Sequence, residues 1–392
     1  MSVAVEVTLG TIAQINPGLN TSSGHADEDV DFLPMSAVEA ASSTAMATET
    51  RPLSEVRKGY TSFADGDVLL AKITPCFENG KIAQVRTNCR FGFGSTEFHV
   101  LRANAAKLDA RYLVHFLRRD QVRIDGERKM TGSAGQRRVP KHFLESLSIP
   151  LPPTTEQRRI AAILDQADAL RAKRREALAQ LDSLTQSIFI EMFGDPAMNE
   201  RHWPRRLVKD IGVVVTGNTP PRANPENYGD EIEWIKSDNI NTPSYYLTRA
   251  EERLSETGRA LGRTVPAGSI LVTCIAGSPE CIGNSAMTDR QVAFNQQINA
   301  FIPTEGNAHF YYGQIQVGKR LIQEASTNGM KGMVSKGRFE QIEFIIPPLK
   351  LQETFGTRVL AVEKQRDLQR DSLAEIDALF ASLQHRAFRG EL

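Results

Sequence analysis

The sequence predicts an α+β protein with two similar halves, each a mixed α/β domain of about 150 residues followed by one long helix. Three observations predict it. The segment that begins at Pro152-Pro153 recurs at Pro347-Pro348, 195 residues later. No glycine or proline interrupts residues 154–193, a length that gives a helix of about eleven turns. Short runs with the pattern of β-strands recur in both halves at offsets of 200 to 202 residues.

The repeat divides the chain into four segments. Between residues 152–193 and 347–388, 11 of 42 positions are identical, whereas average amino-acid usage gives about two or three by chance. Each helix is expected to begin just after its Pro-Pro pair, because proline cannot continue a helix backward. The predicted segments are a first domain at 1–151, a central long helix at 152–195, a second domain at 196–346 and a C-terminal long helix at 347–392.

Both domains read as short strands, a helix and many turns. In the first, strands are predicted at 67–73 and 97–101 and a helical pattern follows at 111–117. In the second, strands are predicted at 269–275 and 297–302 and a helical pattern at 310–322. Little sequence matches between the two domains outside the long helices. A common scaffold therefore carries two different surfaces.

Apolar residues recur on the long helices at steps close to seven, the spacing that is typical of coiled coils. A single long helix cannot bury such a stripe alone, so the two helices are expected to pair with each other. The alternative is that each helix packs only on its own domain. The expected contact residues are Ile160, Ile163, Leu170, Leu178, Leu181, Leu184, Ile188, Val359, Val362, Leu373, Ile376, Leu379 and Leu383.

Composition excludes several classes of protein. The chain has 47 basic and 47 acidic residues, so as a whole it is not a very basic nucleic-acid binder. The four cysteines form no Cys-x-x-Cys pair, so no metal site is expected. No stretch reaches the ~18 apolar residues of a membrane span and the first residues do not resemble a leader. These features predict a cytoplasmic protein without a membrane partner.

Positive charge gathers at the same place in both halves. Residues 111–142 carry nine basic and three acidic residues, and residues 313–338 carry five basic and one acidic. Such segments suit a contact with the nucleic-acid backbone, where each neutralised phosphate releases a counterion. A solvated helix face is the alternative for any single side chain.

Reading of bases needs amides and forked donors that reach into a groove. The candidates lie in turn-rich segments, where an asparagine also has the alternative of making a local turn. The expected DNA contacts of the first half are Lys72, Thr74, Asn79, Lys81, Arg128, Lys129, Arg137, Arg138 and Lys141. Those of the second half are Asn218, Thr219, Arg222, Lys236, Asn239, Asn295, Gln296, Lys331, Lys336 and Arg338.

Motifs of DNA-modifying enzymes are not found. The run from Gly313 to Lys319 approaches a phosphate-binding loop, but Arg320 stands where a Ser or Thr would bind magnesium. No Gly-x-Gly-x-x-Gly occurs, and none of the three Pro-Pro pairs has the flanking residues of an amino-methyltransferase motif. The sequence predicts a reader of nucleic acid without catalytic residues.

These features together resemble the specificity subunit of type I restriction-modification systems. The resemblance covers essentially the whole chain and is most specific where the Pro-Pro pairs lead into the long helices. The residues that carry it are Ile149 to Ile160 (IPLPPTTEQRRI), Phe193-Gly-Asp-Pro196, Ile345 to Glu353 (IIPPLKLQE), Ala387 to Leu392 (AFRGEL), Thr216-Gly-Asn-Thr-Pro220 and Gly132-Ser-Ala-Gly-Gln136.

The resemblance implies two target-recognition domains, each reading one half of a bipartite DNA site in the major groove. It implies that residues 154–193 and 349–388 form an antiparallel coiled coil that sets the spacing and docks two modification subunits, which are methyltransferases. S-adenosylmethionine, ATP and magnesium would belong to the modification and the restriction or motor subunits, and this chain would be non-catalytic. The alternatives are a coiled-coil scaffold that binds no DNA, an enzyme with a cryptic site, and the recognition subunit of a related system whose nuclease is fused to its methyltransferase.

Overall fold

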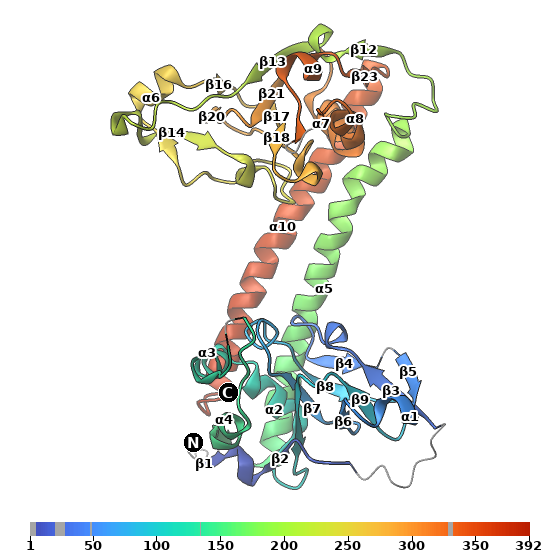
Figure 1. Ribbon diagram of the computed structural model, residues 1–392, viewed down its shortest axis with the longest axis vertical. Helices are drawn as coiled ribbons and strands as arrows, with labels where there is room; N and C mark the ends of the chain where they lie inside the picture. The colour runs from blue at the N-terminus through green and yellow to red at the C-terminus, as the bar shows by residue number, and fades with distance from the viewer. Residues whose placement is uncertain (1–4, 20–27, 48, 134, 328–331) are drawn as a thin grey trace. The chain divides into compact units, whose positions relative to one another are not determined.

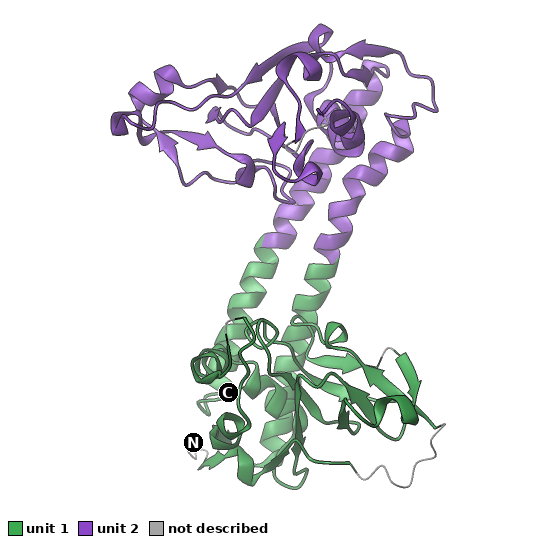
Figure 2. Ribbon diagram, in the orientation of Figure 1, with its two compact units in different colours: residues 1–176, 371–392 green, residues 177–370 purple. Residues whose placement is uncertain are grey.

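The computed structural model describes residues 5–19, 28–47, 49–133, 135–327 and 332–392. The chain forms two compact units, which Figure 2 distinguishes by colour. Unit 1 comprises residues 1–176 and 371–392, and unit 2 comprises residues 177–370. Each unit therefore contains one portion of each long helix. The four-segment division made from the sequence stays a prediction.

Unit 1 is built on two small sheets and one strand pair. The larger sheet has the order β2-β10-β7-β8-β4, with the bounds Ala13–Ile15, Phe98–Ala103, Val68–Ala71, Ile82–Arg86 and Thr44–Met46. The smaller has the order β5-β3-β9-β6, with the bounds Glu49–Pro52, Asp29–Leu33, Gly92–Gly94 and Thr61–Phe63. Strands β1 (Val5–Thr8) and β11 (Ser148–Leu151) pair antiparallel.

Unit 2 repeats this plan. One sheet has the order β13-β21-β17-β19, with the bounds Gly212–Thr216, Ile298–Pro303, Ile270–Thr273 and Ser285–Met287. The other has the order β15-β14-β20-β16, with the bounds Arg253–Leu254, Tyr228–Ile235, Val292–Phe294 and Thr264–Val265. Two further pairs are β12 (Arg205–Leu207) with β23 (Glu343–Ile345) and β18 (Ile275–Ala276) with β22 (Gly332–Met333).

One four-stranded sheet of each unit shows that the two units share one topology. These sheets are β5-β3-β9-β6 in unit 1 and β15-β14-β20-β16 in unit 2. β3 and β9 run parallel in unit 1, and β14 and β20 run parallel in unit 2, while the outer strands of both sheets are antiparallel to them. The four predicted strands are observed as β7, β10, β17 and β21. The predicted repeat is therefore confirmed in three dimensions.

Short helices follow the strands in the same order in both units. They are α1 (Leu53–Val56), α2 (Ala110–Leu117), α3 (Asp120–Lys129) and α4 (Lys141–Ser146) in unit 1, and α6 (Glu256–Leu261), α7 (Ala308–Val317), α8 (Lys319–Glu324) and α9 (Lys336–Glu340) in unit 2. The predicted helix at 310–322 is thus two helices, because the chain breaks at Gly318, where an added Cβ would come within 2.7 Å of the carbonyl oxygen of Gln314.

The glutamine that the repeat preserves ties each long helix to its unit. Gln157 Oε1 accepts the Asp109 N–H at 2.8 Å, and Gln352 Oε1 accepts the Asn307 N–H at 3.0 Å. Both glutamines are buried and donate back to the carbonyl oxygen of the proline five residues before them. Asp109 and Asn307 in turn cap α2 and α7. This arrangement explains why the identity survives in otherwise divergent halves.

The long helices are α5 (Thr154–Phe193) and α10 (Leu349–Ala387), seen in Figure 1 in green and red. In unit 1 the first part of α5 shares a core with the end of α10, through Ile160, Leu164 and Ala387. In unit 2 the end of α5 packs on the start of α10, where the Phe189 and Phe355 rings are 5.4 Å apart. The two helices therefore pair antiparallel.

The predicted contact residues of this pair differ in burial. Ile160, Val359 and Val362 are buried, whereas Leu170, Leu184 and Leu379 are 54%, 39% and 54% exposed and lie outside the contact. The α-helical repeat of 3.6 residues drifts by about 20° per heptad from a strict seven-residue step, which rotates one predicted line of residues away from the partner helix. The other predicted residues are half-buried: Ile163, Leu178, Leu181, Ile188, Leu373, Ile376 and Leu383.

Candidate nucleic-acid interface

In unit 2 seven of the ten predicted DNA-contact residues lie where the parallel strands β14 and β20 end, whereas Lys336 and Arg338 lie on α9. The Asn295 N–H, just after β20, donates to the Ile235 carbonyl oxygen at the end of β14 at 3.0 Å. The Asn218 N–H donates to the Phe294 carbonyl oxygen, also at 3.0 Å. Thr219 donates from its hydroxyl to the side chain of Gln296. Residues from three separate segments thus meet at one edge of the sheet.

The asparagines at this edge hold the loops together. Asn218 donates to the Leu261 carbonyl oxygen at 2.9 Å and accepts the Arg263 N–H at 2.8 Å. Asn239 accepts the Lys236 N–H at 3.1 Å, and Asn295 is buried against the Gln297 side chain. These amides position the backbone, which is the local-turn alternative that the sequence left open.

Cations stay near the surface of the same edge. Arg222 and Lys236 both pair with Glu252, at 3.0 and 2.5 Å, and both lie over the Trp234 ring. Burial of the Glu252 carboxyl acts to raise its pKa, but the hydrogen bonds from Lys236 and Arg222 outweigh burial and lower the pKa. The group therefore carries two positive charges and one negative charge at neutral pH, which suits a phosphate neighbour.

The equivalent edge of unit 1 is where β3 and β9 end. Lys81 donates to the Met35 carbonyl oxygen at 3.1 Å, after β3, and Lys72 donates to the Thr96 carbonyl oxygen at 2.6 Å, after β9. Thr74 donates to Glu78 at 2.8 Å, and Asn79 is exposed in the same turn. The sequence therefore picked residues at matching edges of both units.

Arginines of the first basic segment join this edge through backbone contacts. The Thr74 N–H donates to the Arg137 carbonyl oxygen at 3.0 Å. Arg138 binds Glu97 with both edges of its fork, at 2.9 and 2.8 Å, and this hydrogen bonding lowers the pKa of Glu97. Arg137 lies 3.7 Å from both Glu78 and Glu127. Much of the local positive charge is balanced within the unit.

The net charge counted along the basic segments is therefore larger than the positive charge that their side chains leave without an acidic or carbonyl partner. In unit 1, Arg128 is within 3.8 Å of Asp125 and Lys141 within 3.0 Å of Glu145, while Lys129 is exposed on α3. In unit 2, Lys336 is 3.6 Å from Glu340. Arg338 donates to the carbonyl oxygens of Ala325 and Ser326 just after α8. Lys331 lies outside the described residues.

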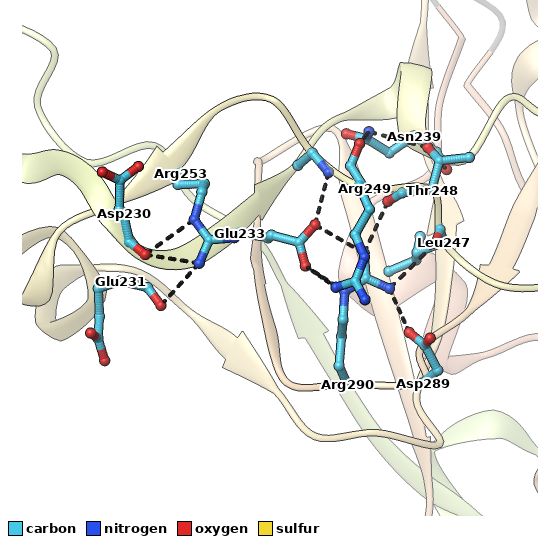
Figure 3. A network of polar contacts seen from close by, with 11 residues as sticks. Asp230, Glu231, Glu233, Asn239, Leu247, Thr248, Arg249, Arg253, Asp289 and Arg290 are labelled. Atoms are coloured by element: carbon cyan, nitrogen blue, oxygen red, sulfur yellow. Dashed lines mark hydrogen bonds and ion pairs between the residues drawn. The ribbon is translucent and has the colours of Figure 1, made fainter.

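Sequence reasoning missed a polar network beside the unit 2 edge, drawn in Figure 3. Glu233 is buried in β14, and Arg290 binds its carboxylate from the segment before β20. Exposed Arg249 lies 3.3 Å from the same carboxylate. The available signal was an acid within the apolar strand run Ile232-Glu-Trp-Ile235, since a buried carboxylate needs a partner.

Two absences concern the described part of the chain only. It contains no group of three or more His, Cys, Asp or Glu side chains placed to hold a metal ion. None of its helices is long and apolar enough to cross a membrane.

Two copies of one α/β scaffold, each carrying part of an antiparallel helix pair, define an internally duplicated two-domain protein. The family model described as type I restriction modification DNA specificity domain matches this chain twice, at residues 2–180 and at residues 200–378. The chain belongs to this family. The double match also confirms the internal repeat found in the sequence.

Specificity subunits of known type I restriction enzymes align with about half of this chain. The specificity subunit of the type I restriction enzyme EcoEI from Escherichia coli is 39% identical over 184 residues, which are 46% of this chain and 31% of that protein. The HindI specificity subunit from Haemophilus influenzae is 28% identical over 207 residues, 49% of this chain and 42% of that protein. The matches thus span less than half the length of these relatives.

Solved structures share the fold over nearly the whole chain. One, from work on complex assembly and conformational transition of the type I restriction-modification system, has a TM-score of 0.62 at 18% identity and covers 100% of this chain and 99% of its own. The type I restriction-modification S subunit from M. genitalium has a TM-score of 0.58 at 14% identity, with 98% and 96% covered.

Proposed function

We propose that this chain is the DNA sequence-specificity subunit of a type I restriction-modification complex. Unit 1 reads one half of a bipartite site in double-stranded DNA and unit 2 reads the other half. The observation that carries this proposal is the repetition of one scaffold with different residues at the same sheet edge. Lys72 and Lys81 occupy that edge in unit 1, whereas Arg222 and Lys236 occupy it in unit 2.

The long helices are the docking surface for two modification subunits, which are methyltransferases, and through them for restriction or motor subunits. Apolar side chains that the helix pair leaves exposed support this assignment, because exposed apolar surface marks contacts with other proteins. They are Leu170, Leu184, Leu360, Leu368 and Leu379. In this proposal S-adenosylmethionine, ATP and magnesium act in the partner subunits, the chain itself is non-catalytic, and the complex works in the cytoplasm.

The deciding experiment is long-read mapping of methylation in host DNA with and without this gene, with the neighbouring modification gene present in both strains. We expect a split motif with a fixed, unread spacer to lose adenine methylation when the gene is deleted. Re-expression of the chain should restore the same motif. If methylation stays unchanged while the protein is expressed, the scaffold that binds no DNA becomes the better description.

A further inference from the structure

A buried carboxylate organises the DNA-facing edge of unit 2. Glu233 is 5% exposed and lies two residues before the end of β14. Its Oε1 accepts the Ala250 N–H at 2.9 Å and an N–H of Arg290 at 3.1 Å, and its Oε2 accepts from Arg290 Nε. A carboxylate buried this deeply is stable only when such donors surround it. Glu233 therefore ties the segment at 247–250 to β14.

Arg290 binds the same carboxylate and the same segment, residues 247–250. Besides binding Glu233, it donates to the Leu247 carbonyl oxygen at 3.3 Å and to the Thr248 carbonyl oxygen at 3.0 Å, and it pairs with Asp289 at 2.5 Å. Its side chain is only 17% exposed. Figure 3 shows the guanidinium enclosed by these groups. Its donors are used within the unit, so Arg290 is not itself free for a ligand.

Arg249 is different, because it is held at one point and open elsewhere. One of its terminal nitrogens lies 3.3 Å from the Glu233 carboxylate, yet its side chain is 78% exposed. Its carbonyl oxygen accepts from Asn239, the residue that also fixes the backbone of Lys236. The Arg249 backbone thus lies beside the loop that carries Lys236, and its side chain lies on the Glu233 face of β14, opposite the face where Arg222 and Lys236 lie over Trp234. No local sequence pattern distinguishes Arg249 from the other arginines.

We propose that Arg249 reads a guanine in the half-site of unit 2, with Glu233 and Arg290 as the residues that position it. This inference rests on the proposed function. A guanidinium offers two parallel donors that match O6 and N7 of guanine in the major groove, and this is the commonest specific contact between proteins and DNA. The contact of one terminal nitrogen with Glu233 restricts the direction of the guanidinium and leaves its Nε and other terminal nitrogen to face such a pair of acceptors.

A base contact fits the site better than a phosphate contact does. A phosphate accepts from any direction and needs charge more than orientation. Here Glu233 offsets part of the charge of Arg249 while restricting the direction of its donors. The contact with Glu233 therefore restricts the direction of the Arg249 donors and lowers the net positive charge around them. Base reading depends on donor direction more than on net charge.

The test is carried out on the full chain expressed with its modification subunits, by mapping methylation for each variant. Arg249→Ala should relax one guanine position in one half-site, with discrimination against other bases at that position falling about 10- to 100-fold. Arg249→Lys should behave similarly, because lysine keeps the charge and loses the fork. The half-site read by unit 1 should stay unchanged in both variants and serves as the internal control for folding.

Two further variants test the positioning residues. Glu233→Gln keeps the size and one acceptor but removes the charge, so it should relax the same position less than Arg249→Ala does. Arg253→Ala is the matched control, because Arg253 lies on the other side of Glu233 in Figure 3 and donates to the carbonyl oxygens of Asp230 and Glu231. It should leave the motif unchanged. A Glu233→Gln motif identical to wild type would overturn the positioning role.

Other outcomes overturn the guanine contact. If Arg249→Ala weakens methylation equally at all sites and Arg249→Lys restores it, Arg249 binds phosphate. If both variants direct methylation of the wild-type motif, Arg249 does not contact a base. The failure of the proposed function looks different, since in that case the wild-type chain itself directs no split motif.

Discussion

The two units place a buried carboxylate at the same point of the same parallel strand pair, but they use it differently. Asp31 in β3 lies two residues before the last pair of its ladder, Leu33 with Gly94, and Glu233 lies two residues before Ile235, which pairs with Phe294. Asp31 accepts the backbone N–H groups of Asn88 and Cys89, at 2.6 and 2.9 Å.

Glu233 has one more methylene and binds two arginine side chains in addition to a backbone N–H. In both units this carboxylate anchors the segment that leads into the second parallel strand, β9 in unit 1 and β20 in unit 2. The units differ in the side chains that the carboxylate holds at the surface, which in unit 2 include Arg249. In unit 2 the anchoring carboxylate and the exposed arginine thus come from separate segments of the chain.

A second difference lies where each unit packs on the long helices. In unit 1, Asp165 on α5 accepts from Arg111 and His115 of α2, and His115 is fully buried. Leu360 corresponds to Asp165 at the repeat offset of 195, and Gly313 corresponds to His115 when the helix caps Asp109 and Asn307 are aligned. Unit 2 fills this junction with the rings of Phe189, Phe193, Phe310 and Phe355, whose centroids are 4.9 to 5.7 Å apart. Unit 1 also has an aromatic contact here, since the Phe388 ring lies 5.0 Å from Tyr112 and 5.5 Å from Phe116. The two units therefore differ in the ionic contact of Asp165, which unit 1 has in addition.

The helix pair itself keeps one feature in both units, an acid–arginine–acid triad. In unit 1, Arg171 lies 3.0 Å from Asp168 on its own helix and 2.5 Å from Asp377 across the pair. In unit 2, Arg366 lies 2.5 Å from Glu363 and 3.2 Å from Asp182 across the pair. The members of the two triads correspond at the repeat offset of 195. Asp168, Glu363 and Arg366 are buried and Arg171 is 17% exposed, whereas Asp377 and Asp182 across the pair are 40% and 49% exposed. Polar contacts between paired helices favour one register.

The largest effect is expected from lengthening the helices between the two triads. Four residues inserted after Glu176, with four more after Arg370, add about 6 Å of helix, against about 3.4 Å per base pair. Both triads and both sheet edges stay intact, so the half-sites should stay the same while the spacer grows by one or two base pairs. Methylation mapping measures the spacer directly. An unchanged spacer would show that the helices do not set it.

The triads should also contribute to stability, and not equally. Arg171→Leu leaves Asp168 buried without its cation and is expected to lower the free energy of unfolding by about 3 kcal/mol. Arg366→Leu should lower it less, by about 2 kcal/mol, because burial already raises the pKa of Glu363 and makes its protonation easier. Urea unfolding of the variants at pH 7 measures both losses.

Arg370→Leu is the control for this series. Arg370 is 41% exposed and pairs only with Asp367 on its own helix among the ion pairs of the described chain. A surface pair of this kind contributes about 0.3–0.5 kcal/mol. If Arg171→Leu were no more destabilising than this control, the triad could not hold the register.

Much of the architecture could be predicted from the sequence, because the two halves share identical residues at a fixed offset that can be counted. The Pro-Pro pairs and the uninterrupted residues 154–193 predicted the long helices, and the apolar stripes predicted their pairing. Burial along the helices was predicted less well, since Leu170 and Leu184 continue a seven-residue step from Ile163 that the helix does not follow. A period read from sequence locates a helix more reliably than it locates the contact face.

The candidate interface shows a similar division. Residues chosen from the sequence lie together at matching sheet edges, because turn-rich polar segments follow the strands that end there, and their contact with DNA stays a prediction. It did not distinguish Asn218, whose amide holds a loop, from Arg222, which stays at the surface. It also missed Arg249, whose position depends on Glu233 and Arg290 from distant segments. Partners far apart in sequence decide which side chains are free, and no local pattern records them.

The smallest effect concerns the ionic junction of unit 1 and its dependence on pH. Burial of Asp165 acts to raise its pKa, but hydrogen bonds from His115 and Arg111 outweigh burial and lower the pKa from 3.8 to about 2. A lowered carboxyl pKa stabilises the folded state at pH values above 3.8, and this stabilisation disappears as the pH falls toward 2. Asp165 is 35% exposed, so after allowance for solvent screening we expect a contribution of about 1 kcal/mol.

Asp165→Asn should therefore lower the free energy of unfolding by about 1 kcal/mol at pH 6. Its difference from the wild type should shrink between pH 4 and pH 3. Hydrogen exchange of the α2 amides at these pH values measures the effect within unit 1, and the α7 amides of unit 2 give the internal reference. Asp367→Asn, at a carboxylate that is 71% exposed, should show no such dependence. An Asp165→Asn difference that stays constant down to pH 3 would mean that shape, and not charge, joins α2 to α5.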